Sequence, residues 1–166
     1  IASYIEGDPR FSYGYKNRRD IIAEWARKEF KNLEVLRQAN VRAPAPIKCV
    51  QNILIMEYIG DASKPAPMLK DVVLRDPKKV FDEIITFMTR MYKKQLVHAD
   101  LSAFNILMFR QKPYIIDVGQ GVLLDHPSSL EFLKRDIHNI VHYFKKYGIE
   151  SNEQRIFDQL VKKKKG

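Results

Sequence analysis

The sequence predicts an α+β fold, and two features carry that prediction. Apolar residues recur at the spacing of an amphipathic helix in three long segments, which are residues 21–39, residues 79–93 and the stretch from Pro127 to just before Gly148. Between the last two, short apolar runs flank a turn signal, as in a β-hairpin: Ile106–Phe109, Arg110–Pro113 and Tyr114–Ile116. A chain of 166 residues, 45% of them apolar, can bury one modest core. We therefore expect a mostly helical domain with a small amount of sheet.

The first helical segment carries a carboxylate in the middle of its apolar stripe. The stripe consists of Ile22, Trp25, Leu33 and Leu36. Glu29 lies on the same face, four residues from both Trp25 and Leu33. A carboxylate in such a position is costly unless it is paired or reaches water at the edge of the stripe. Glu29 is therefore either a functional residue with a cationic partner or an ordinary stripe-edge residue.

The middle of the chain is predicted to continue as strand, linker and helix. A strand over Asn52–Tyr58 follows the link that ends at Pro44-Ala45-Pro46, and residues 63–68 form an extended linker because they include two prolines. Met88 and Met91 lie on the apolar face of the next helix, where a core role is the simplest one. The last helix has an apolar stripe formed by Leu130, Leu133, Ile137, Ile140, Val141 and Phe144.

Three polar residues around the hairpin have the chemistry of a metal and base site. Asp100 lies on the loop that leads into the hairpin, Asn105 directly precedes its first strand, and Asp117 follows its second strand. Folding about Gln111 pairs position 106 with position 116, which sets Asn105 beside Asp117. Hard oxygen ligands in this number suit Mg²⁺ carried with a nucleotide phosphate, not zinc. The set therefore predicts the metal and base half of a phosphoryl-transfer site.

The order and spacing of these residues resemble those of protein kinases, whose catalytic loop carries Asp-x4-Asn and whose metal-binding Asp follows later. Two short motifs differ from ordinary protein kinases, since Ala99 stands in place of arginine and Val118 in place of phenylalanine. Four motifs carry the likeness, namely Met56–Gly60, His98–Asp100, Asp117–Gly119 and Asp125–Pro127. From about Ile5 to about Ile149 the sequence resembles the Rio family of atypical serine/threonine protein kinases, most closely its first, archaeal-like subfamily.

The resemblance implies a two-lobed, protein-kinase-like fold. Residues 1–59 would form a small lobe truncated at its N-terminus, and residues 60–166 a mostly helical large lobe with a basic tail at Lys162–Lys165. The family's Gly-rich phosphate-covering loop and strand lysine are expected before residue 1, because the chain contains neither. The small lobe would also carry a mobile basic loop over residues 7–20.

The resemblance also implies a role for each candidate residue. Asp100 would orient the attacking hydroxyl or water and accept its proton, while Asn105 and Asp117 would hold Mg²⁺ (or Mn²⁺) against the phosphates of ATP. Glu29 would pair with the strand lysine that holds those phosphates, and so belongs with Asp100 among the catalytic candidates. His98 would pack beneath the metal loop as a structural residue.

Adenine is expected at the hinge between the lobes, and phosphorylation at two positions. By resemblance, Glu57 offers its carbonyl, Ile59 offers its carbonyl and N–H, and Met56 guards the back of the pocket. In related family members the metal-binding Asp itself can be phosphorylated, so Asp117 is a candidate acceptor as well as a ligand. Ser12, the only serine in the mobile loop, is a second candidate, although a solvated loop serine is the simpler interpretation.

Composition also indicates which partners and which cellular compartment to expect. The net charge of +9 favours nucleotide phosphates, RNA or ribonucleoprotein surfaces, although a solvated basic surface would also explain it. The single Cys49, the lack of a long apolar run and the lack of a signal peptide predict a cytoplasmic protein without membrane contact. The leading hypothesis is an ATP-dependent Rio-type kinase or ATPase that acts on the pre-ribosomal small subunit. Two alternatives are a small-molecule phosphotransferase of the aminoglycoside type and a non-catalytic nucleotide-binding scaffold on pre-ribosomes.

Overall fold

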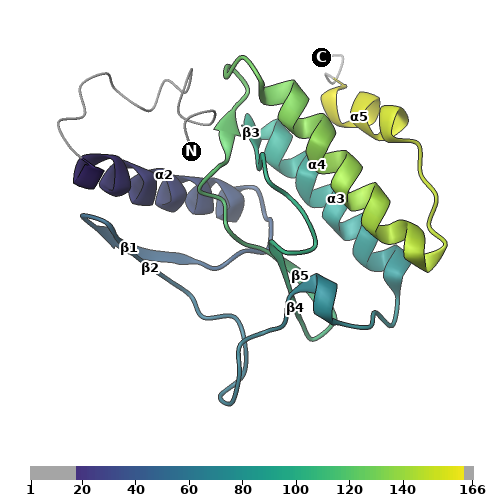
Figure 1. The fold of residues 1–166 in the computed structure, drawn as a ribbon, viewed down its shortest axis with the longest axis horizontal. Helices are drawn as coiled ribbons and strands as arrows, with labels where there is room; N and C mark the ends of the chain where they lie inside the picture. Colours follow the sequence, from purple (N-terminus) through teal and green to yellow (C-terminus); the bar gives the residue numbers. More distant parts are fainter. Residues whose placement is uncertain (1–17, 163–166) are drawn as a thin grey trace.

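The computed structural model describes residues 18–162, whose longer elements form two groups (Figure 1). In the first group, helix α2 (Arg18–Gln38) lies over an antiparallel hairpin of β1 (Pro46–Val50) and β2 (Ile53–Met56). The second group is helical and consists of α3 (Pro77–Lys93), α4 (Ser129–Phe144) and α5 (Glu153–Val161). The α+β class predicted from the sequence is confirmed.

Short elements lie between the longer ones along the chain. They are η1 (Leu69–Asp71), β3 (Leu96–Val97), β4 (Ile106–Phe109), β5 (Lys112–Ile115), β6 (Val122–Leu123) and η2 (Lys145–Tyr147). Strand β3 pairs with β6, and β4 pairs with β5, both antiparallel. The segments before and after the β4–β5 hairpin, which carry Asp100 and Asp117, therefore run between the helical group and α2 (Figure 1).

The first predicted helix is confirmed as α2, but its apolar stripe is buried only in its second half. Leu33 and Leu36 are 1% and 0% exposed, whereas Ile22 is 44% exposed. Ile22 lies in the second turn of α2, outside the buried core that surrounds Leu33 and Leu36. The predicted strand over Asn52–Tyr58 is the shorter β2, and its partner β1 was not predicted.

The central hairpin forms where the sequence predicted it, but its register differs by one residue. Ile106 pairs with Ile115, not with position 116. The reason is the turn, in which Arg110 and Gln111 have φ values of 51° and 61°. Two successive residues in the left-handed region form a tight two-residue hairpin turn, so the second strand begins earlier than a four-residue turn would allow.

Pro113 misled the prediction of that turn. It lies inside β5, opposite Met108. The Met108 N–H donates to Pro67 O at 2.8 Å, on the side of β4 away from β5. The Met108–Pro113 pair is therefore one of the pairs that exchange no hydrogen bonds. Proline has no N–H to donate, so its presence at this position removes no hydrogen bond between the strands.

The helical group follows the predicted periodicity, with differences at the helix ends. Helix α3 starts at Pro77, two residues before the predicted position, because the Asp76 carboxylate caps it by accepting from Lys79 N at 3.0 Å. Met88 and Met91 are buried core residues, as predicted. In α4, Leu130 is 47% exposed because it lies in the first turn, before the helix reaches the core. Helix α5 was not predicted.

One hydrophobic core joins the two groups. Leu33 and Leu36 of α2 belong to the same buried cluster as Val118, which follows Asp117, and as Ile137 of α4. The second half of α2 is therefore fixed to the helical group, and this contact determines where Glu29 points. No helix within residues 18–162 is long and apolar enough to cross a membrane.

Candidate active site

The loop that carries Asp100 is held by side chains of α4. Asp136, which is 1% exposed, accepts hydrogen bonds from Ala99 N–H at 2.8 Å and from Leu101 N–H at 2.9 Å. Arg135 donates to the carbonyl of Ala99, and Asn139 donates to the carbonyl of Leu101 at 3.1 Å. These bonds bracket Asp100 on both sides and involve none of its side-chain atoms.

Residues of the loop itself bind the remaining backbone groups. Asp100 N–H donates to His98 Nδ1 at 3.2 Å, and the carbonyl of Asp100 accepts from Asn105 Nδ2 at 2.8 Å. Every backbone N–H and C=O of residues 99–101 therefore has a side-chain partner, although the loop has no regular secondary structure. These hydrogen bonds also hold Ala99 in the left-handed region, with φ at 69°, a conformation that a residue with a Cβ rarely adopts.

His98 connects the Asp100 loop to the segment before Asp117. Its Nε2 donates to Ile116 O at 2.9 Å, while its Nδ1 accepts from Asp100 N–H. The ring is 2% exposed, and burial lowers the pKa of His98 below its ordinary value, so the imidazole is neutral. A neutral ring with one donor and one acceptor nitrogen fits both bonds. This is the structural position that the sequence predicted for His98.

The two metal-ligand candidates lie next to each other in the strand register. Ile116 N–H donates to Asn105 O at 3.0 Å, so Asn105 lies opposite Ile116 and one position from Asp117. Asn105 Nδ2 also donates to Asp100 Oδ2 at 3.2 Å, which leaves Asn105 Oδ1 as the amide atom available to a cation. The Asp117 carboxylate is exposed, on a residue with φ at 56°.

The donor set suits a Mg²⁺ or Mn²⁺ ion that is shared with a nucleotide, and does not suit a metal ion held by protein side chains alone. Within residues 18–162 no group of three or more His, Cys, Asp and Glu side chains is arranged to hold a metal ion. Asn105 and Asp117 offer one amide and one carboxylate oxygen. Mg²⁺ typically binds one or two carboxylates and completes its shell with water and phosphate oxygens.

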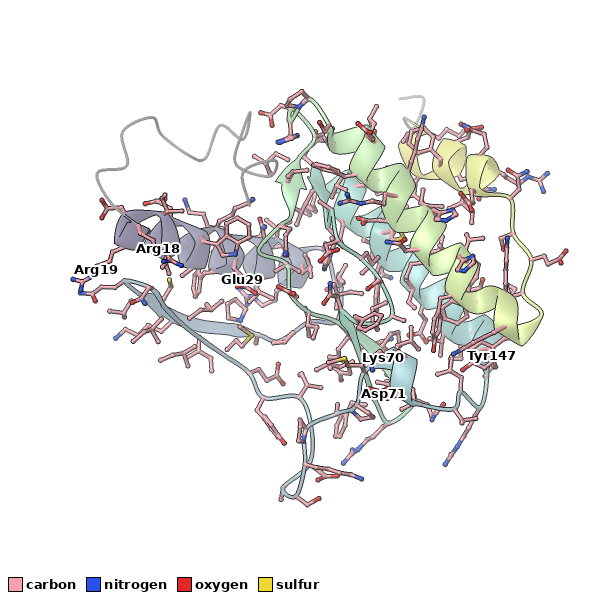
Figure 2. The ribbon with its side chains drawn as sticks, in the orientation of Figure 1. Arg18, Arg19, Glu29, Lys70, Asp71 and Tyr147 are labelled. Carbon is pink, nitrogen blue, oxygen red and sulfur yellow. The ribbon has the colours of Figure 1, made fainter. Side chains whose placement is uncertain are left out.

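Glu29, which was predicted to pair with a strand lysine, lies half-buried on α2. It projects from α2 toward the middle of the molecule (Figure 2). Burial raises the pKa of the Glu29 carboxyl, and repulsion from Asp117 raises that pKa further. No residue within 18–162 forms an ion pair with Glu29. The Glu29 and Asp117 carboxylates are therefore close enough to repel each other, as two groups that share a cationic ligand would be.

At the hinge, the backbone groups assigned to adenine are partly engaged. Glu57 N–H donates to Ala45 O at 2.8 Å, so this N–H belongs to the sheet and the carbonyl is the group left for a ligand. The carbonyl of Ile59 accepts from Ala66 N–H at 2.9 Å, so the contribution predicted for Ile59 falls to its N–H. Met56 is half-buried and packs against the core. Ser12, the second predicted phospho-acceptor, lies outside the described residues.

The residues that hold these groups in place were not predicted from the sequence. Asp136 follows the same rule as Glu29, since it is a carboxylate inside an apolar stripe, between Leu133 and Ile137. That signal was available and not used. Arg135 and Asn139 carried no such signal, because a polar residue at the edge of a stripe ordinarily faces water.

Taken together, a firmly held aspartate loop, an adjacent amide and second aspartate, and a half-buried helix glutamate have the chemistry of a phosphotransferase site of the protein-kinase type. The RIO domain family matches residues 1–157. The chain therefore belongs to the RIO family, whose relatives are named serine/threonine-protein kinases. The predicted resemblance to this family is confirmed.

Three relatives illustrate the similarity. RIO-type serine/threonine-protein kinase Rio1 of Thermoplasma acidophilum is 48% identical over 163 residues, which cover 98% of this chain and 86% of that protein. Rio1 of Haloferax volcanii is 35% identical, with 95% and 54% covered, and human serine/threonine-protein kinase RIO1 is 42% identical, with 88% and 27% covered. The chain thus spans most of the first relative and about half or less of the other two.

Solved structures confirm the kinase-like fold. The Rio2 kinase from Chaetomium thermophilum has a TM-score of 0.73 at 23% identity, with 93% of this chain and 54% of that chain covered. A second structure of that kinase, described as an ADP/Mg²⁺-phosphoaspartate complex, has a TM-score of 0.72 at 22% identity, with 93% and 52% covered.

Proposed function

We propose that this chain carries the base and metal half of an ATP- and Mg²⁺-dependent serine/threonine kinase site. The observation that carries the proposal is the loop at residues 99–101, in which every backbone polar group is bound by a side chain. A loop held so completely fixes the backbone of Asp100, and Asn105 Nδ2 donates to its Oδ2 at 3.2 Å. Phosphoryl transfer depends on positioning and charge stabilisation, and a firmly held Asp100 meets the requirement for positioning.

Each residue has a separate task in this proposal. Asp100 orients the attacking hydroxyl and accepts its proton, and Asn105 Oδ1 and Asp117 hold the cation. Mg²⁺ or Mn²⁺, when bound, neutralises charge on the nucleotide phosphates. Glu29 orients the lysine that holds the nucleotide phosphates in protein kinases.

The nucleotide is proposed to lie between a small lobe of residues 1–59 and a large lobe of residues 60–166. Adenine would meet the carbonyl of Glu57 and the N–H of Ile59, with Met56 behind it. Asp117 is also proposed as a phospho-acceptor, supported by its exposed carboxylate and by the phosphoaspartate described for the related Rio2 kinase. Ser12 is the second proposed acceptor.

The biological setting is proposed to be the cytoplasm and the pre-ribosomal small subunit. A net charge of +9 supports an RNA or ribonucleoprotein partner, because positive potential attracts phosphate-rich surfaces. The family resemblance supports the particular partner, and the protein substrate is not identified by either argument.

The test is metal-dependent ATP turnover by full-length Asp117→Asn protein. The substitution removes one anionic ligand at nearly constant volume, so we expect most Mg²⁺-dependent turnover to be lost while the far-UV circular dichroism spectrum is kept. Asp158→Asn, an exposed change on α5, is the matched control and should keep wild-type turnover. Wild-type turnover by Asp117→Asn would refute the metal assignment. Phosphate transfer to kanamycin but to no protein would favour the small-molecule phosphotransferase instead.

A further inference from the structure

One face of α2 contacts the segment that directly follows the metal ligand Asp117. Asn32, on this face, is 1% exposed. Its Nδ2 donates to Val118 O at 2.8 Å and to Gly121 O at 3.4 Å, across more than 80 residues of sequence. Gly121 N–H in turn donates to Val118 O at 3.1 Å, so residues 118–121 form a closed turn, the metal-loop turn. Asn32 thus donates to the carbonyls of the first and the last residue of this turn.

The two glycines of the segment mark where α2 comes closest. A Cβ on Gly121 would lie 2.9 Å from Asn32 Nδ2, and a Cβ on Gly119 would lie 2.5 Å from Trp25 Nε1. Trp25, Glu29 and Asn32 occupy successive turns of one helix face. Trp25 lies against Gly119 and Asn32 against Gly121, while Glu29, between them on the helix, is repelled by the charge of Asp117. At both positions a side chain of α2 therefore packs directly on the backbone, where only glycine leaves enough room.

This contact works against an electrostatic repulsion at its centre. Burial and the charge of Asp117 both raise the pKa of the Glu29 carboxyl, so the two carboxylates repel each other, and this repulsion favours separation of α2 from the metal loop. Asp117 also has φ at 56°, a conformation that needs support from its surroundings. Asn32 is a neutral donor that binds the turn without adding charge, so it can hold Asp117 near Glu29 before any cation arrives.

We propose that Asn32 is a positioning residue for the metal ligand Asp117. Its amide fastens the metal-loop turn to α2, so the Asp117 carboxylate is already placed when the cation and nucleotide bind. The inference rests on the proposed function in one respect, namely that Asp117 binds the metal. It differs from an ordinary buried hydrogen bond in one measurable way. A merely structural amide would change stability, whereas a positioning amide changes the affinity for the metal.

The experiment measures ADP affinity of full-length protein by titration calorimetry, once with Mg²⁺ and once with EDTA. The ratio of the two affinities is the metal-dependent gain. Loss of a residue that orients a metal ligand typically costs about 10- to 100-fold in metal affinity. We therefore expect Asn32→Ala and the nearly isosteric Asn32→Asp to lose about tenfold or more of the gain, with affinity in EDTA unchanged.

Two further variants separate this role from general destabilisation. Gly121→Ala approaches the same contact from the other side, since its Cβ would lie 2.9 Å from Asn32 Nδ2, 3.0 Å from Val118 O and 3.3 Å from Val97 O, and it should lower the gain as Asn32→Ala does. Asn152→Ala removes the cap that accepts from Arg155 N–H at 2.8 Å at the start of α5, so it should lower stability by about 1 kcal/mol and keep the full gain.

The outcomes separate this inference from the proposed function. A lower thermal midpoint with an unchanged gain in both Asn32→Ala and Gly121→Ala would overturn the positioning role and leave the metal site intact. Wild-type protein without any metal-dependent gain would overturn the metal site itself, and the role of Asn32 with it.

Discussion

Asp136→Asn tests the support of the Asp100 loop most sharply. The two carboxylate oxygens of Asp136 accept from Ala99 N–H and Leu101 N–H at 2.8 and 2.9 Å. Asparagine has the same size but carries an NH₂ group in place of one oxygen, and this group cannot accept. One buried backbone N–H therefore loses its partner, which costs about 1–3 kcal/mol.

The size of this loss depends on pH, because burial raises the pKa of Asp136 from 3.8 to about 7. Hydrogen bonds from Leu101 and Ala99 and the charge of Arg135 lower that pKa, but burial outweighs them. An acid with a raised folded-state pKa gives stability that is fully present below the unfolded-state pKa and is lost as pH rises through the folded-state value. From 3.8 to about 7, at about 1.4 kcal/mol for each unit of pKa, the loss is at most about 4–5 kcal/mol.

Asparagine does not titrate, so the variant lacks this pH-dependent loss. We expect Asp136→Asn to be most destabilising near pH 4 and progressively less so toward about pH 8. The assay is urea unfolding of full-length wild-type and variant protein, followed by circular dichroism across that pH range. A destabilisation that is constant, or that grows as pH rises, would refute the assignment of a raised pKa to a carboxylate buried behind the Asp100 loop.

Two other contacts give further predictions. Gly119→Ala places a Cβ 2.5 Å from Trp25 Nε1, so we expect a loss of about 1–3 kcal/mol in unfolding free energy. Because Trp25 is the only tryptophan, its fluorescence emission should shift as well, and unchanged emission would show that the indole does not rest on Gly119. Arg42 pairs with Glu83 and also donates Nε to Pro113 O at 3.0 Å. Lysine cannot make both bonds, so Arg42→Lys should lower the free energy of urea unfolding by about 1–2 kcal/mol, and an unchanged value would show that one bond is enough.

The site residues were predictable because their spacing is local. Asp100, Asn105 and Asp117 flank one hairpin, and chemistry together with spacing was enough to group them. The register was not predictable to the residue, because it depends on Arg110 and Gln111 both adopting positive φ, which neither residue type indicates.

The residues that hold the site in place make contacts between distant parts of the sequence, and sequence patterns do not predict such pairs. Asp136 binds backbone groups 35 and 37 residues away, and Asn32 binds carbonyls 86 and 89 residues away. Periodicity predicts that such residues lie on a buried face, but it does not identify their partners. Strand β1 was missed for a related reason, since only two of its five residues are half-buried and the other three face outward, which weakens the pattern.

The central claim is that Asp100 acts on the acceptor and not on the nucleotide, and Asp100→Ala tests it most directly. The variant keeps the Asp100 carbonyl, which makes the shorter bond to Asn105 Nδ2 at 2.8 Å, so the metal-ligand amide stays in place. We measure ADP affinity with Mg²⁺ by calorimetry and phosphate release in a single turnover, on full-length protein. The account predicts unchanged affinity and a rate lower by about 10²–10⁴, the usual cost of losing a general base. A folded variant that loses nucleotide affinity together with turnover would contradict it.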